Sequence, residues 1–314
     1  MKLNKNIQAL GLSLITLGFI QSAQAQQDPQ YTQYMYNHAN INPAYAGSVD
    51  HLSIFGHYRT QWVGLDGAPK TANISATTPL GDSGLGMGVH FMNDRIGVMD
   101  ENNIAIDLSY AVDLNNNYKL AFGVKGSGNI LNVDYTRLHP HNTSEIAELG
   151  NNVNKFTPNV GAGMFLYSDK AYVGFSVPNL LTRTRYDDNK YGTEVNTLRQ
   201  KMHYYLTGGY VFDLSRDVKF KPAALVKATT GAPLQVDLTA NFVFMERLTV
   251  GAAYRWDASV SGLVGFQVNE NIFLGYSYDA ETTALRHYNS GSHEFFVRFD
   301  LFSKIRRVNA PRYF

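Results

Sequence analysis

Histidines and glycine-rich runs are the parts of this sequence whose spacing could support chemistry. His139 and His141 flank Pro140, but no third metal ligand follows at a defined spacing, so we expect an ordinary loop. A phosphate-binding loop is followed by a helix, but no helix is expected after the glycine-rich runs 84–88 and 123–128. Cysteine is absent, which excludes thiol nucleophiles and cysteine-based metal sites. We therefore predict no metal and no cofactor.

Four further histidines are candidates for catalysis at one rim of the molecule: His57, His90, His203 and His287. Asp, Glu and Ser residues are scattered around them, but no spacing pairs a nucleophile with a base and an orienting acid. Catalytic triads are recognised by geometry and not by position in the sequence. We predict that the protein is not an enzyme.

The composition restricts the class of protein. The net charge of the 314 residues is +1, so we expect no nucleic-acid partner. Charged residues make up 17%, below the roughly 25% of ordinary soluble domains, while aromatic residues reach 13%. This balance is typical of a tyrosine-rich β-sandwich or of an outer-membrane β-barrel with aromatic girdles.

The first residues favour the envelope alternative. Lys2 and Lys5 precede an apolar run at 7–20, and Ala23-Gln24-Ala25 is a small-x-small cleavage site. We predict that residues 1–25 are a signal peptide and that Gln26 begins the mature chain. No later run approaches the ~20 apolar residues of a transmembrane helix, so a further membrane crossing needs a closed barrel.

Strand-like alternation runs through the rest of the chain. In the run 103–112, one face is apolar, formed by Ile104, Ile106, Leu108, Tyr110 and Val112. The opposite faces of this and later runs are rich in Gly, Ala and Ser. They also carry both charge signs, from Lys119, Lys125, Lys219, Lys221, Lys227, Arg255 and Arg298 and from Asp107, Asp237, Asp279, Glu294 and Asp300. Such a face suits a crowded polar lumen better than the exposed face of a sandwich.

Fourteen candidate strands follow from the alternating runs. They lie near 51–59, 69–79, 84–93, 102–113, 118–130, 156–167, 170–177, 201–212, 218–228, 233–243, 248–255, 258–268, 271–279 and 293–302. Every second connection is a short polar turn, and those between include the long stretches 131–155 and 178–200. We predict an all-β, antiparallel outer-membrane barrel of about 14 strands with both termini in the periplasm.

The expected organisation is a signal peptide at 1–25, a plug segment at 26–50, a barrel at 51–302 and a periplasmic basic tail at 303–314. About twenty mature residues precede the first strand, enough to fill the lumen. We expect Tyr31, Tyr34, Tyr36, Asn42 and Tyr45 to enter it from the periplasmic side, because tyrosine hydroxyls can meet a charged lumen. In the tail, Lys304, Arg306, Arg307 and Arg312 are suited either to solvent or to periplasmic components.

The stretch DPQYTQYMYNHANINPAYAGS at 28–48 resembles the N-terminal signature of the PorP/SprF family of type IX secretion system outer-membrane proteins. The segment YRTQW at 58–62 is also similar to a family motif that follows the first strand. The family motif covers Asp28, Pro29, Gln30, Gln33, Tyr34, Met35, Asn37, Asn42, Pro43, Ala44 and Gly47, together with Tyr45 beside them. His38-Ala39-Asn40 departs from the usual tripeptide before the NPA box.

The resemblance implies an accessory of type IX secretion. Its partners would be the secretion machinery, outer-membrane lipid and a secreted protein with a type IX C-terminal domain, such as a surface adhesin in gliding motility. We expect it to support export and surface attachment of that partner, and an outer-membrane solute channel is the alternative. In the second long loop, Leu180, Leu181, Tyr186 and Tyr191 are apolar residues that a solvated loop does not need, so we predict partner binding there.

Overall fold

The structure is a computed structural model that describes residues 29–115, 117–137, 153–182, 184–186, 198–199 and 201–301. The predicted signal peptide, the basic tail, Asp28, Tyr191 and His139–His141 lie outside the described residues. For β8 (Thr184–Tyr186) and β9 (Leu198–Arg199), which pair with each other, only the backbone is described.

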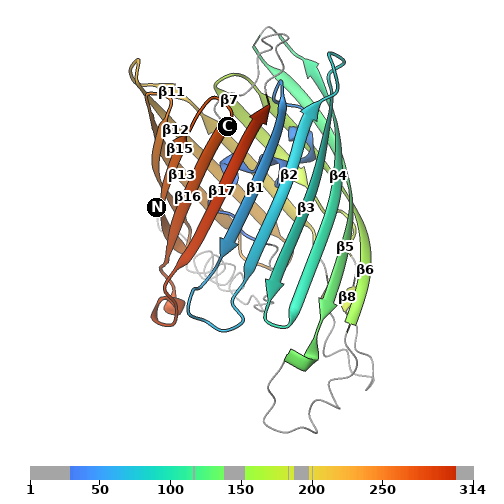
Figure 1. Cartoon of the computed structure of the whole chain (residues 1–314). Helices are drawn as coiled ribbons and strands as arrows, with labels where there is room; N and C mark the ends of the chain where they lie inside the picture. Colours follow the sequence, from blue (N-terminus) through green and yellow to red (C-terminus); the bar gives the residue numbers. More distant parts are fainter. Residues whose placement is uncertain are drawn as a thin grey trace, which may run out of the picture.

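One antiparallel sheet closes on itself to form a barrel (Figure 1). Neighbours in sequence pair around it, β1 pairs with β17, and β10 pairs with both β7 and β12. The sheet has fifteen strands, but β10 and β11 share one position beside β12, so the barrel has fourteen, as predicted. The strands are β1 (Leu52–Thr60), β2 (Lys70–Pro79), β3 (Leu85–Ile96), β4 (Met99–Asp113), β5 (Lys119–Val133), β6 (Val153–Tyr167), β7 (Ala171–Val177), β10 (His203–Tyr210), β11 (Phe212–Asp213), β12 (Val218–Thr229), β13 (Gln235–Phe244), β14 (Leu248–Arg255), β15 (Ser259–Gln267), β16 (Ile272–Glu281) and β17 (Ser292–Leu301).

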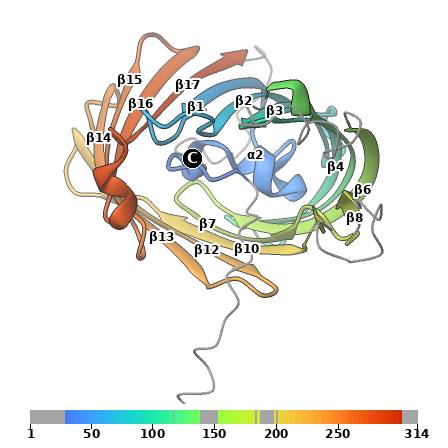
Figure 2. The same ribbon diagram turned by 90° about the horizontal axis from the view of Figure 1, so that it is seen from below.

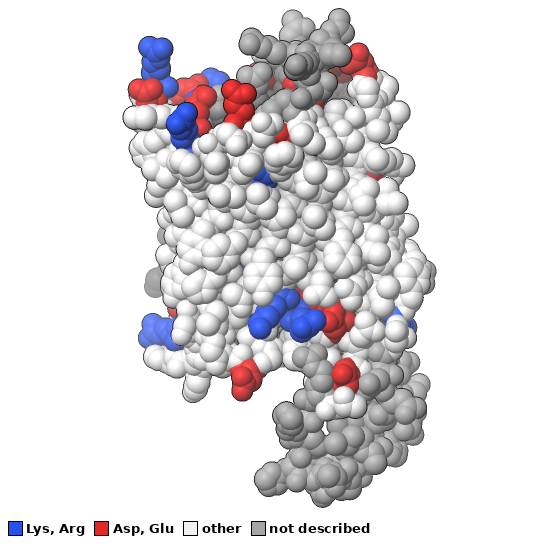
Figure 3. All heavy atoms as spheres, viewed as in Figure 1, with Lys and Arg blue, Asp and Glu red and all other residues white. Residues whose placement is uncertain are grey.

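The apolar face of each strand points outward, as the alternation predicted. On β4, Ile104, Ile106 and Leu108 are each about half exposed, whereas Ala105 and Asp107 between them are buried. Figure 3 shows the result on one face of the molecule, a broad belt of uncharged atoms between two zones with charged side chains. An apolar belt around a polar interior is the arrangement that a bilayer requires.

The two ends of the barrel differ in their connections. The long-loop end, at the bottom of Figure 1, has the connections at 61–69, 97–98, 134–152, 178–202, 230–234, 256–258 and 282–291, with η3 (Tyr135–Arg137) and η4 (Ala284–His287). The short-turn end has those at 80–84, 114–118, 168–170, 214–217, 245–247 and 268–271, together with the end of β17.

Several predicted boundaries were wrong. The expected loop at 94–101 is a two-residue turn between β3 and β4, where Gly97 adopts φ +57°. The expected loop at 131–155 begins and ends in strand, because β5 continues to Val133 and β6 already starts at Val153. Leu131 and Val133 are buried on the inner face, and this continued alternation extends β5. No helix among the described residues is long and apolar enough to cross a membrane.

Candidate functional site: the N-terminal segment in the barrel

Residues 29–51, hereafter the N-terminal segment, lie inside the ring of strands (Figure 2). The segment folds as three short helical elements, η1 (Tyr34–Tyr36), α2 (His38–Ile41) and η2 (Pro43–Tyr45). The Asn42 side chain accepts a hydrogen bond from the N–H of Ala44, and Pro43 stands at the first position of η2. Asparagine at the cap and proline at the first position both favour a helical start, so the NPA sequence defines this turn locally.

A buried carboxylate holds the start of the segment. Glu294 accepts hydrogen bonds from the backbone N–H groups of Thr32 and Gln33, each at 2.9 Å. The same carboxylate accepts one from Arg59 at 2.7 Å and lies 3.3 Å from the His57 ring. Because the Glu294 side chain is not exposed at all, these contacts replace its water shell.

Arg59 joins this carboxylate to a second one. Its guanidinium lies 2.6 Å from Asp279, which accepts a hydrogen bond from the Thr32 hydroxyl at 2.7 Å. The three charged side chains come from β1, β16 and β17, and each is almost completely buried. This group, Arg59, Asp279 and Glu294, is called the carboxylate cluster below. It binds the segment through both the backbone and a side chain.

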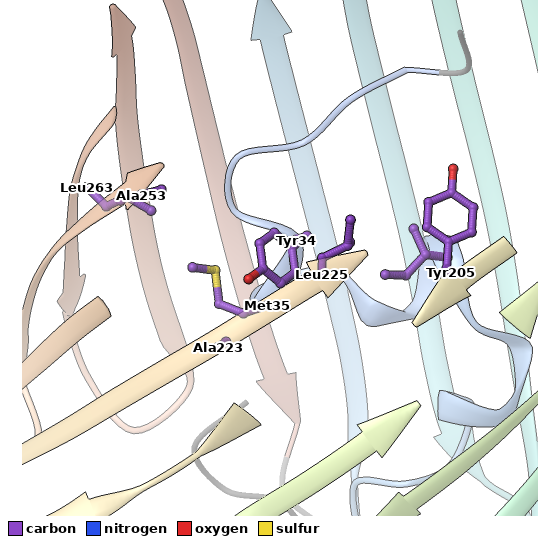
Figure 4. Close-up of a cluster of buried hydrophobic side chains, with 8 residues drawn as sticks. Tyr34, Met35, Tyr205, Ala223, Leu225, Ala253 and Leu263 are labelled. Carbon is purple, nitrogen blue, oxygen red and sulfur yellow. The ribbon is translucent and has the colours of Figure 1, made fainter. Parts of the chain in front are cut away.

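The next residues pack on a neighbouring part of the wall that extends from β15 to β10. Tyr34 and Met35 lie in an apolar cluster with residues of β10, β12, β14 and β15 (Figure 4), whose barrel members are Tyr205, Ala223, Leu225, Ala253 and Leu263. The Tyr34 hydroxyl donates to the carbonyl of Asp237 at 3.4 Å. Beside it, Arg255 pairs with the Asp237 carboxylate at 2.5 Å and donates to the carbonyl of Tyr31 at 3.2 Å. The segment therefore contacts a continuous arc of the wall, from β1 through β17 to β10.

Aromatic contacts surround the next tyrosine of the segment, Tyr36. The Tyr36 ring packs on Phe273 and Phe296, with centroids 5.3 and 5.1 Å away. The ammonium group of Lys221 lies 5.1 Å from the Tyr36 ring, within range of a cation–π contact. Burial raises the pKa of Tyr36 to about 12, so its hydroxyl is neutral.

His38 is buried among aromatic rings. Its ring lies 4.6 Å from Tyr172 and 5.3 Å from Tyr45, and neither of its nitrogens has a hydrogen-bond partner among the described residues. Burial, and then the charge of Lys221, lower the pKa of His38 to about 3. The histidine therefore serves as a neutral, flat packing group and not as an acid or base.

Glycines in the wall make room for the NPA turn. A Cβ on Gly123 would lie 2.3 Å from the backbone nitrogen of Ala44, and one on Gly163 would lie 2.1 Å from the Asn42 side chain. Real Cβ contacts under 3.0 Å are essentially absent from proteins. The Asn42 amide also donates to the carbonyl of Met164 at 2.9 Å. Close backbone approach, and not phosphate binding, explains the first of these glycines.

The segment leaves the lumen at the short-turn end. A Cβ on Gly86 would lie 2.3 Å from the carbonyl oxygen of Ala46, and the Ser109 hydroxyl donates to the same carbonyl. Gly47 adopts φ +68°, and a Cβ on it would lie 2.5 Å from the Gly86 Cα. Glycine is thus required both by conformation and by space. His51 then lies 3.3 Å from Asp300 near the end of β17.

The structure brings the sequence-predicted motif residues together. Of the twelve, Asp28 is outside the described residues, and the other eleven all lie in the N-terminal segment. Tyr31, Tyr34, Tyr36, Asn42 and Tyr45 each contact the inner wall. The predicted loop residues are separate from them, since Leu180 and Leu181 follow β7 at the long-loop end.

Sequence reasoning missed Arg59 as a residue of the lumen. Asp279 and Glu294 were predicted to face the lumen but had no assigned partner. In β1, Arg59 lies directly opposite Glu294 of β17. The YRTQW motif was a usable signal, because it overlaps the predicted strand at 51–59, and Tyr58, Arg59 and Thr60 all belong to β1.

The histidines considered for catalysis do not form a catalytic constellation. His90 bonds to Asp107 at 2.6 Å, and Asp107 also faces Lys125 at 3.5 Å, all buried inside the wall. His203 bonds to Thr229, and His57 is part of the surroundings of Glu294. Among the described residues there is no group of three or more acidic or histidine side chains placed to hold a metal ion.

Comparison with known proteins decides the family. Residues 23–299 match the family described as "Type IX secretion system membrane protein PorP/SprF". The chain belongs to the PorP/SprF family. Family membership together with the barrel fold makes this an outer-membrane protein with a role in type IX secretion. No curated protein sequence matches the chain significantly.

Solved structures similar to this PorP/SprF protein are barrels. The CymD monoaromatic hydrocarbon channel is 12% identical, with a TM-score of 0.50 and coverage of 84% of this chain and 92% of that chain. The Acinetobacter baumannii outer membrane protein Omp33 is 8% identical, with a TM-score of 0.46 and coverage of 81% and 100%. At such identities the likeness to CymD shows the fold alone.

Proposed function

We propose that this PorP/SprF protein binds the C-terminal domain of a secreted partner, such as a surface adhesin in gliding motility. It supports the export and surface attachment of that partner. The observation that carries the proposal is the match to a type IX secretion family over residues 23–299, a range that covers the N-terminal segment and nearly all of the barrel. The barrel's interior is occupied by its own N-terminal segment, which leaves the loops as the surface for a protein-sized partner.

The N-terminal segment acts as a plug in this proposal. Support comes from its contacts around the wall, with the carboxylate cluster, with the Tyr34 cluster and with the wall glycines at the NPA turn. Three buried residues of the motif, Gln33, Met35 and Asn42, are each 2% exposed or less. A segment that merely rested in a wide channel would leave such side chains in water.

The long-loop end faces the cell exterior, and the short-turn end faces the periplasm. Outer-membrane barrels usually have short periplasmic turns and longer external loops, which supports this orientation. It places the end of β17, and hence the start of the basic tail, on the periplasmic side. There, Lys304, Arg306, Arg307 and Arg312 are available to components of the secretion machinery.

The partner-binding surface is the loop that follows β7. Leu180 is 40% exposed, and its backbone position is defined because its N–H donates to the carbonyl of Val160 at 2.8 Å. The Asn159 side chain bonds to both the N–H and the carbonyl of Leu181. The base of the loop is thus an ordered platform that carries an exposed apolar side chain, and Tyr186 and Tyr191 complete the proposed site.

Loop replacement tests the proposal. Residues 183–200, or separately 138–151, are replaced by a short Gly–Ser linker, and retention of the secreted partner on the cell surface is measured. A matched control replaces residues 114–117 at the short-turn end. We expect loss of retention for at least the first loop and none for the control. Unchanged retention in both loop variants, with normal amounts of folded barrel in the outer membrane, would refute the proposal.

A finer test leaves the loop intact. Leu180→Ser combined with Leu181→Ser removes the apolar contact and keeps the backbone hydrogen bonds, so we expect weaker retention of the partner. Leu114→Ser is the control, because Leu114 is 56% exposed at the opposite end. Equal retention in the two variants would exclude these leucines from the binding site.

A solute channel is the second candidate function. The likeness to CymD, a protein described as a channel, and the polar inner face favour it. A channel predicts that the intact protein conducts ions or supports solute uptake. The plugged barrel predicts almost no conductance until the N-terminal segment is removed.

A further inference from the structure

The N-terminal segment crosses the whole barrel in one direction. At its start, Thr32 and Gln33 bind Glu294, two residues after β17 begins. Arg59 next to them is one residue before the end of β1. The end of β1 and the start of β17 both lie at the long-loop end.

The later part of the segment lies at the opposite end. Ala46 contacts Gly86 near the start of β3, and His51 contacts Asp300 near the end of β17. Both positions belong to the short-turn end. The chain therefore enters the described part of the lumen near the long loops and runs toward the short turns, where β1 begins.

The few residues that precede the segment are too short to span the lumen from the long-loop end back to the short-turn end. β16 has 10 residues, about 33 Å along the strand and about 25 Å along the barrel axis at the usual tilt. With cleavage after Ala25, the mature chain has only Gln26, Gln27 and Asp28 before Pro29, which span about 10 Å when extended.

We infer that the mature N-terminus opens at the long-loop mouth and faces the cell exterior. This inference differs from the expectation that both termini are periplasmic: only the C-terminus stays in the periplasm. The inference rests on the orientation given under the proposed function and on the signal cleavage after Ala25 that the sequence predicts. It places the chain end and the partner-binding loops in one compartment, so a secreted partner docked on those loops meets the N-terminus as part of the same surface.

Absence of cysteine makes the inference directly testable. A single Cys in a short Gly–Ser linker is inserted between Gln26 and Gln27, and whole cells are treated with a membrane-impermeant maleimide before and after outer-membrane permeabilisation. Asp66→Cys at the long-loop end and Asp82→Cys at the short-turn end are matched controls, since both side chains are exposed. Where the linker variant does not fold, Gln27→Cys takes its place.

We expect the inserted Cys to label in intact cells to the same extent as Asp66→Cys, and Asp82→Cys to label only after permeabilisation. Labelling of the inserted Cys only after permeabilisation, with both controls as expected, overturns the inference. So does a lack of labelling in both conditions, because the chain end is then not displayed. Reversed controls would instead overturn the orientation in the proposed function.

Discussion

Replacing Gly123 by alanine should weaken the docking of the N-terminal segment. The added Cβ would lie 2.3 Å from the nitrogen of Ala44 and 2.4 Å from the carbonyl carbon of Pro43, where ordinary contact is 3.4–4 Å. Both atoms belong to backbone, so no side chain can rotate away and the NPA turn must move by about 1 Å. Overpacking of this kind costs about 1–3 kcal/mol.

The effect is measured by hydrogen exchange of the amides in residues 37–47. A loss of about 1–3 kcal/mol in docking free energy accelerates exchange about 5- to 150-fold if exchange reports on undocking. Gly126→Ala is the matched control, because Gly126 is on the same strand, is exposed, and would have no atom within 4 Å of its Cβ. Equal exchange in the two variants would refute the idea that this glycine exists to accommodate the segment.

Three further substitutions probe other parts of the account. Glu294→Gln leaves Arg59 and His57 beside a neutral group and should lower the free energy of unfolding by about 3–5 kcal/mol, which a heat-modifiability assay shows as unfolding at a lower temperature. Glu246→Gln is the control, because that carboxylate is 69% exposed, and it should lower the free energy of unfolding by less than about 1 kcal/mol. Docking should weaken as pH falls from 6.5 toward 3, by up to about 1.4 kcal/mol per unit, because the free His38 binds a proton that its buried form, with a pKa of about 3, does not. Above pH 6.5, the titration of His38 should not change the docking free energy. In His38→Phe, hydrogen exchange of residues 37–47 should therefore show a shallower pH dependence. Ile106→Lys on the lipid face should make the free energy of folding into bilayers less favourable by about 2–4 kcal/mol, while Leu114→Lys in a short turn should leave it unchanged.

The wall of the barrel was predictable because alternation is a local property. The run from Ile104 to Val112 shows its lipid-facing and inner-facing residues directly, and β4 has the predicted burial pattern. Boundaries failed where alternation continued into an expected loop, as on both sides of the turn at Gly97 and beyond Leu131. In both places pairing with the adjacent strand extended the sheet.

Interior partners were not predictable in the same way. Arg59 and Glu294 are 235 residues apart, and they meet only because the first and last strands pair when the barrel closes. The roles of Gly123 and Gly163 likewise depend on an N-terminal segment that has no helical or strand period. Its motif identified which residues matter, but the direction of the chain through the lumen required contacts at both ends.

Conductance in planar bilayers tests most directly whether the N-terminal segment closes this barrel. The intact protein is compared with a variant that lacks 28–47, with Gly126→Ala as a folded control. The account predicts almost no conductance for the intact protein and the control, and a stable ion conductance for the deletion variant. Equal, open conductance in all three would contradict it and favour a solute channel.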